Sequence, residues 1–139
     1  MPPRKALLDT DILLSIMQQN PSVLSKAKVY IEEHGRFTFS VITRYEISRG
    51  LKAIGASKRA GAFDRFCSGS ELLPLDEGIA ARAADVYAEL KVKGELIGDA
   101  DILIAASALV NGLVIVTNNE AHFRRIRGLS VENWMTAHH

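Results

Sequence analysis

Short apolar runs alternate along this chain with longer segments of helical periodicity. The run from Leu113 to Val116 contains only apolar residues, which is typical of a parallel strand that is buried on both faces. Helical segments between such runs provide the crossover connections that parallel strands need. The sequence therefore predicts an α/β fold in which helices cover both faces of a short, mainly parallel sheet.

The expected elements follow from this alternation and from the capping and turn residues around it. Strands are expected at 5–8, 36–41, 71–75 and 113–117, with a short edge strand at 129–131. Helices are expected at 21–34, 43–54, 57–67, 77–93, 99–110 and 120–127, and the residues predicted to open four of them are Thr43, Ser57, Asp76 and Asp99.

Helical spacing also predicts which side chains are buried. For helix 21–34 the expected apolar face consists of Val23, Leu24, Ala27 and Ile31. For helix 77–93 it consists of Ile79, Ala83, Val86, Tyr87 and Leu90. Helix 99–110 is apolar nearly all round, so we expect it to be a central, buried element.

The bulk composition describes an ordinary globular protein. A chain of 139 residues with 47% hydrophobic content predicts one domain over 1–139, large enough for its own core. We expect the last few residues, including His138 and His139, to be a flexible tail. The single cysteine, Cys67, excludes an internal disulfide and is predicted to be a buried thiol. None of the four histidines has the spacing of a zinc site.

Charge and hydropathy limit the partners. The net charge is only +1, so any surface for nucleic acid must be local. Asp9 and Asp11 interrupt the first apolar stretch too early for a signal peptide. The longest apolar run is broken by Asn111 and Gly112 and is too short to cross a membrane. We expect a soluble, cytoplasmic protein without a membrane partner.

Four polar side chains stand where strands or loops give way to helices. They are Asp9, Glu46, Asp101 and Asn119. The carboxyl ends of parallel strands meet at one edge of a sheet, and open α/β sheets bind their ligands there. Carboxylates crowded at that edge repel one another unless a cation neutralises them. Oxygen ligands of this kind suit a hard cation such as Mg²⁺ or Mn²⁺.

Each of these side chains also has a purely structural explanation. Asp9 or Thr10 can cap the first helix, and Asn119 can cap the helix that starts near Glu120. The segment Thr43 to Glu46 has the pattern of a capping box. Asp99 and Asp101 are two residues apart and do not face each other on a helix. We therefore favour Asp101 as the primary ligand and Asp99 as a helix cap and second ligand.

Four segments of the chain form an ordered set of motifs. In chain order they are LLDTDILL, SVITRYEISRGL, GDADILIAASALVNGLVIVTNN and NEAHFRRIRGLSVENW. These segments resemble the PIN-domain family, and within it the VapC-type toxins of bacterial toxin–antitoxin pairs. The second has Ile47 where leucine is common in the family. The order and spacing of the four segments extend the resemblance over almost the whole chain.

The resemblance implies a three-layer α/β/α fold and a ribonuclease that depends on Mg²⁺ or Mn²⁺. Asp9, Glu46 and Asp101 match the first three acids of the family's site. Asp99 matches an accessory acid, and Thr117, with Thr10, lies in the same pocket. Position 119 departs from the pattern, because Asn119 stands where many members carry a fourth aspartate and brings no charge.

The resemblance also implies partners. These are an RNA substrate such as a tRNA, a small antitoxin that covers the active site, and a second copy of the chain in a homodimer. Contact with DNA is expected only through a complex with the antitoxin.

Phosphate contacts are expected from local basic side chains. The candidates lie beside Glu46 and just beyond Asn119, and they are Arg44, Arg49, Lys52, Arg124 and Arg125. Such charge runs are also common on surfaces that only face solvent.

Two other functions are compatible with the same residues. Asp9 and Asp11 have the Asp-x-Asp spacing of haloacid-dehalogenase-like phosphatases, although this chain is short for that class. A PIN-like module that binds RNA or metal without cutting is the non-enzymatic alternative, and Asn119 is the residue that favours it.

Overall fold

The computed structural model describes residues 1–136, so the expected flexible tail with His138 and His139 lies outside the described residues. The strands are β1 (Ala6–Leu8), β2 (Thr38–Ser40), β3 (Glu71–Leu73), β4 (Val114–Val116) and β5 (Val131–Glu132). The helices are α1 (Thr10–Met17), α2 (Pro21–His34), α3 (Val41–Ala53), α4 (Ser57–Ser68), α5 (Glu77–Lys93), α6 (Asp99–Val110) and α7 (Glu120–Phe123).

All strand pairs are parallel, as predicted. β4 lies between β1 and β5, with Leu7 opposite Ile115. β2 pairs with β3, with Phe39 opposite Leu72. These two ladders lie next to each other, because β1 contacts β2, but no ladder of hydrogen bonds joins them. The strands are also shorter than expected, because the chain enters a helix or a turn soon after each strand passes through the core.

The hydroxyl of Tyr30 occupies the seam between the two ladders. It accepts a hydrogen bond from the backbone N–H of Ala6 at 3.1 Å and donates one to the carbonyl of the same residue at 3.3 Å. Tyr30 is fully buried on α2. A side chain therefore satisfies backbone groups of β1 that a neighbouring strand usually satisfies.

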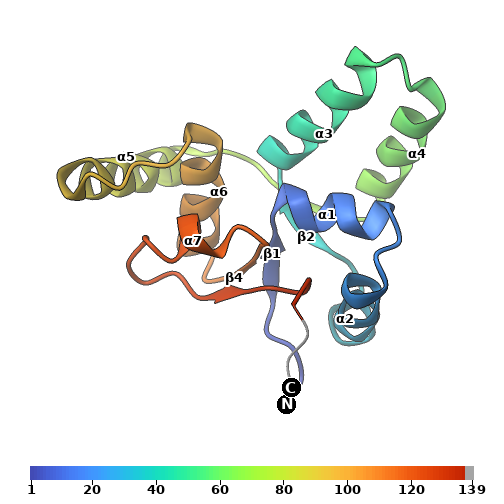
Figure 1. Cartoon of the computed structure of the whole chain (residues 1–139), viewed down its shortest axis with the longest axis horizontal. Helices are drawn as coiled ribbons and strands as arrows, with labels where there is room; N and C mark the ends of the chain where they lie inside the picture. Colours follow the sequence, from blue (N-terminus) through green and yellow to red (C-terminus); the bar gives the residue numbers. More distant parts are fainter. Residues whose placement is uncertain (137–139) are drawn as a thin grey trace.

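Helices cover both faces of the sheet, which confirms the three-layer α/β/α architecture. Figure 1 shows α5 and α6 on one side of β1, and α1, α2, α3 and α4 on the other. Alternate residues of β1 point to opposite faces. Ala6 and Leu8 pack with the helices from α1 to α4, and Leu7 packs with α5 and α6.

One predicted helix start is wrong by two residues, and two predicted caps do not form. α3 begins at Val41 because Ser40 caps it by accepting from the N–H of Ile42 at 3.0 Å, so Thr43 lies inside the helix. Ser57 is the first residue of α4 and caps nothing. Gly98 stands at the cap position of α6, so Asp99 is its first residue. Asp76 does cap α5, as predicted.

Two of the predicted apolar faces also need correction. Leu24 and Tyr87 are exposed, and the buried aromatic residue of α2 is Tyr30. α6 is buried over most of its length, as predicted, and Cys67 is buried. Among the described residues, no helix is long and apolar enough to cross a membrane.

Replacing Tyr30 with phenylalanine tests the seam between the ladders. Tyr30→Phe leaves the N–H and carbonyl of Ala6 without their partner, so we expect the free energy of unfolding to fall by about 1–3 kcal/mol. Denaturant unfolding measures this change. The control is Tyr87→Phe, which removes an exposed hydroxyl and should change stability by less than about 0.5 kcal/mol. Equal stability of the two variants would contradict a role of the hydroxyl in the seam.

Candidate functional site

Asp9 follows β1 directly and lies at the centre of a hydrogen-bonded network. It is the N-cap of α1, where its Oδ1 accepts from the N–H of Thr10 at 2.8 Å. Its Oδ2 accepts from the hydroxyl of Thr117, which follows β4, at 2.8 Å. Only 5% of Asp9 is exposed. The capping and the site interpretations of Asp9 therefore both hold, because its two oxygens act on different partners.

Glu46 joins this network through Thr10. The hydroxyl of Thr10 donates to Oε1 of Glu46 at 2.8 Å and lies 3.0 Å from the hydroxyl of Thr43. Glu46 does not close a capping box with Thr43, because α3 begins two residues earlier. The start of α1 and the second turn of α3 are thereby held together at the carboxyl edge of the sheet.

Asn119 and Asp101 are connected through a histidine that the sequence reasoning did not select. The backbone N–H of Asn119 donates to the hydroxyl of Thr117 at 2.9 Å. The Nδ1 atom of His122 lies 2.8 Å from Nδ2 of Asn119 and 3.3 Å from Oδ2 of Asp101. A continuous chain of contacts therefore links Glu46 to Asp101. The position of Asn119 at the start of α7 was predicted, but its side chain forms no cap.

Asp11 is a second residue that the sequence reasoning left out of the site. Its Oδ2 accepts from the backbone N–H of Asn118 at 3.0 Å. Its Oδ1 is buried and has no hydrogen-bond partner among the described residues. Asp9 precedes α1 in extended conformation, so the rule that helical residues two apart face different ways does not separate Asp9 from Asp11. The Asp-x-Asp spacing was the available signal.

The acids influence one another's protonation. Burial, together with the negative charges of Asp11 and Asp101, raises the pKa of Asp9 from its ordinary value of 3.8 to about 7, against the lowering effect of its two hydrogen bonds. Burial also raises the pKa of Asp11, and the charge of Asp101 adds to that rise. Asp9 and Asp11 thus resist ionisation, and the charge of Asp101 adds to that resistance.

Asp99 is the predicted site residue that stands apart. It is exposed at the first position of α6 and forms no side-chain hydrogen bond or ion pair with another described residue.

Three of the five predicted phosphate-binding residues are engaged within the protein. Arg44 pairs with Asp64 at 3.2 Å, and Arg124 pairs with Glu120 at 2.7 Å. Arg125 donates to the backbone carbonyls of Glu95 and Leu96. Arg49 and Lys52 form no ion pair with an acid in the described part of the chain.

The donor set fits a hard cation, although it is incomplete. Among residues 1–136, no three His, Cys, Asp or Glu side chains converge closely enough to hold a metal ion by themselves. Mg²⁺ usually keeps several waters and shares its shell with substrate phosphate, so a partial set of protein oxygens suits it. The unpartnered Oδ1 of Asp11 is a buried acceptor that a cation or its water would satisfy.

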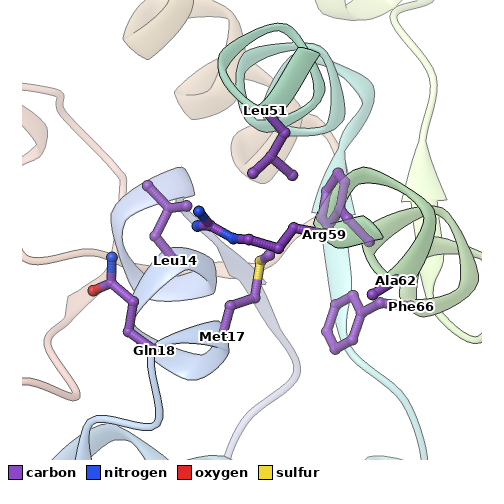
Figure 2. Close-up of a pocket in the computed structure, with 8 residues that line it drawn as sticks. Leu14, Met17, Gln18, Leu51, Arg59, Ala62 and Phe66 are labelled. Atoms are coloured by element: carbon purple, nitrogen blue, oxygen red, sulfur yellow. The ribbon is translucent and has the colours of Figure 1, made fainter. Parts of the chain in front are cut away.

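An apolar pocket of about 320 Å³ lies between α1, α3 and α4, the helices on one side of this edge. Figure 2 shows the guanidinium of Arg59 reaching across it towards Leu14 of α1. The other lining residues are Met17, Gln18, Leu51, Ala62, Phe63 and Phe66. α1 and α3 thus contribute residues both to the pocket and to the site.

Comparison with known proteins agrees with this geometry. The model of the PIN domain family matches residues 6–129. The ribonuclease VapC2 of Haemophilus influenzae is 33% identical over 133 residues, which are 94% of this chain and 98% of that protein. The tRNA(fMet)-specific endonuclease VapC of Shigella flexneri is 30% identical over 131 residues, again 94% and 98% of the two chains.

Solved structures give the same result. The VapBC2 complex of Rickettsia felis, solved with a DNA fragment from its promoter, contains a chain that superposes with a TM-score of 0.84. The two chains are 27% identical, and the match covers 93% of this chain and 98% of that one. The protein described here therefore belongs to the PIN-domain family. Within that family it falls among the VapC-type ribonucleases.

The raised pKa of Asp9 predicts how the stability of the metal-free protein depends on pH. The folded state holds a proton on Asp9 up to about pH 7, and the unfolded state loses it near 3.8. Between these values the folded state binds more protons, so this group's contribution to the free energy of unfolding should fall by about 1 kcal/mol per pH unit as the pH rises.

Thermal unfolding in EDTA across this range, for the unmodified chain and for Asp9→Asn, isolates this contribution. We expect the asparagine variant to lose less stability between pH 5 and pH 8, because it carries no titrating group at this position. Parallel pH profiles would show that Asp9 is already ionised in the folded protein.

Proposed function

We propose that this protein is the toxin of a toxin–antitoxin pair and that it cleaves RNA phosphodiesters with the help of Mg²⁺ or Mn²⁺. The observation that carries the proposal is the chain of hydrogen bonds and close polar contacts from Glu46 through Asp9 to Asp101 at the carboxyl edge of the sheet. The raised pKa of Asp9 supports it, because a cation would offset the burial and the charge repulsion that oppose ionisation there.

In this proposal Asp9, Glu46 and Asp101 hold the cation directly or through water. Asp11 takes the place that the sequence reasoning gave to Asp99, because it has a buried, unpartnered oxygen and feels the charge of Asp101, while Asp99 is exposed. A bound divalent ion supplies charge neutralisation for the developing oxyanion and lowers the pKa of bound water.

The remaining residues of the network position these ligands. The hydroxyls of Thr10 and Thr117 fix the carboxylates of Glu46 and Asp9, so that few rotamers remain open to them. His122 holds the amide of Asn119 and touches Asp101. Asn119 supplies an oxygen without a charge, so we expect a weak metal site that gains affinity when RNA phosphate joins it.

RNA is the substrate we propose, and cleavage would take place in the cytoplasm. The relative from Shigella flexneri is named for its action on tRNA(fMet), so a tRNA is the first substrate to test. A silent binding module is the second candidate, and Asn119 is the observation that favours it. A phosphatase nucleophile at Asp9 is disfavoured, because both of its oxygens accept hydrogen bonds and the residue is 5% exposed.

We propose that the antitoxin binds in the apolar pocket between α1, α3 and α4. The neighbouring solved structures are toxin–antitoxin complexes, and the pocket offers an apolar floor beneath the cation of Arg59. An inserted apolar side chain would lie against the helices that carry Thr10 and Glu46. We also propose a homodimer, and contact with DNA only through the antitoxin.

The ribonuclease proposal is tested with Asp101→Asn and Asp11→Asn on a mixture of tRNA and rRNA. We expect the unmodified protein, purified free of antitoxin, to cut in Mg²⁺ or Mn²⁺ and to stop in EDTA. Asp101→Asn should cleave more than about a hundredfold more slowly, because a ligand of the charge-neutralising cation is lost. Gel analysis of the fragments identifies the cut RNA.

Asp11→Asn keeps the size of the side chain and should raise the Mg²⁺ concentration needed for half-maximal cleavage. Asp99→Asn is the matched control at an exposed acid and should change neither quantity. Full cleavage by Asp101→Asn would reject the assigned site. An intact, folded protein that cuts no RNA would favour the silent module.

The proposed antitoxin-binding site is tested by placing a charge in the pocket. Ala62→Glu puts a carboxylate against the apolar lining, so we expect the toxin to lose co-purification with its antitoxin while RNA cleavage persists. The control is Ala84→Glu, at an exposed alanine of α5. Retention of the antitoxin by both variants would remove the pocket from the interface.

A further inference from the structure

Among the five basic residues expected to contact phosphate, those that remain free to meet a substrate lie on one helix. Of the five basic residues expected to contact phosphate, Arg49 and Lys52 are the two that have no acidic or backbone partner in the described part of the chain. Both belong to α3, the helix that carries Glu46. A phosphate backbone that approaches the site would therefore meet its strongest attraction along this helix.

Tyr45 lies on the same helix and is unusually open. Its residue surface is 59% exposed, more than that of any other aromatic residue in the described chain, while Tyr30 and Trp134 belong to the core. The guanidinium carbon of Arg49 sits 5.0 Å from the centre of the Tyr45 ring. This cation–π contact holds the exposed ring in place one helical turn from Arg49.

The pair stands beside the candidate site. Tyr45 directly precedes Glu46, whose carboxylate accepts from Thr10. Arg49 lies three residues after Glu46, so the two side chains are neighbours on the helix surface. A chain of nucleotides with one phosphate near Glu46 would thus pass over Arg49 and Tyr45 next.

A shallow hollow of about 320 Å³ lies along the face of α3 that carries Tyr45. Val41, Tyr45, Ser48 and Lys52 line it along α3. Arg44 and Asp64 complete the lining, and the two pair with each other. Its size suits a single nucleotide, and its lining combines an aromatic face, a hydroxyl and a free ammonium group. These are the chemical groups that proteins use for single-stranded RNA.

We propose that Tyr45, held by Arg49, stacks on one nucleobase adjacent to the cleaved phosphodiester, with Lys52 at the following phosphate. Bases within a duplex are paired and stacked, so this surface selects a single-stranded loop or end. Stacking uses the flat face that every base has, so it discriminates little between bases. The inference rests on the proposed ribonuclease function and adds the kind of RNA segment that is bound.

The test uses the cleavage-defective Asp101→Asn protein and a fluorescently labelled, single-stranded RNA octamer. Fluorescence anisotropy measures the Kd for this background alone and with Tyr45→Leu, Tyr45→Phe or Tyr87→Leu added. We expect Tyr45→Leu to weaken binding about fivefold to a hundredfold. Tyr45→Phe keeps the aromatic face and should stay within about twofold. Tyr87→Leu is the matched control, because it removes an exposed tyrosine of α5.

Two further RNAs separate stacking from charge attraction. Tyr45→Leu should leave the Kd for an octamer with abasic sites unchanged, because no base remains to stack. It should also leave the Kd for an RNA duplex unchanged. An equal loss of affinity for all three RNAs, or no loss of affinity for the single-stranded octamer, would overturn the stacking role.

Cleavage by the protein with native Asp101 distinguishes this proposal from the parent function. If that protein cuts RNA and Tyr45→Leu binds the octamer normally, the ribonuclease proposal is supported and the stacking proposal is rejected. If it cuts no RNA and Tyr45→Leu still binds single-stranded RNA selectively more weakly, the stacking proposal is supported and the cleavage proposal is rejected.

Discussion

The burial of one carboxylate organises the edge of the sheet on which the candidate site is built. Asp9 leaves β1, starts α1 and accepts a hydrogen bond from Thr117 at the end of β4. A negative charge with 5% exposure is costly unless hydrogen bonds or a cation compensate it. The two hydrogen bonds compensate only in part, which is why the pKa of Asp9 rises to about 7. The local fold therefore depends on the Asp9 carboxyl, whose preferred protonation state would change if a cation bound beside it.

Small polar side chains connect Asp9 to the other residues at this edge of the sheet. Thr10 and Thr117 each contact a carboxylate and a second group, so the positions of Glu46, Asp9 and Asn119 depend on one another. Hydroxyls suit this task because each one donates and accepts. A network of this kind is rigid when all members are satisfied, and the unpartnered oxygen of Asp11 is the point at which it remains open to a ligand.

Sequence reasoning reached the fold class and most of the elements because apolar periodicity and parallel-strand patterns are local signals. It placed the start of α3 too late, because Ser40 ends a strand and caps a helix at the same time. It grouped Asp9, Glu46, Asp101 and Asn119, which the structure connects. It omitted Asp11 and His122, since their importance arises from three-dimensional contacts with Asn118, Asn119 and Asp101. The split between the two ladders likewise depends on Tyr30, a residue of a distant helix.

The apolar pocket and the acidic edge draw on the same two helices. α1 supplies Leu14 to the pocket and Thr10 to the network, and α3 supplies Leu51 to one and Glu46 to the other. If the antitoxin binds in this pocket as we propose, a substitution that changes which partner fits there alters the scaffold of the site as well. Evolution towards a different antitoxin is then limited to substitutions that leave the acidic edge intact.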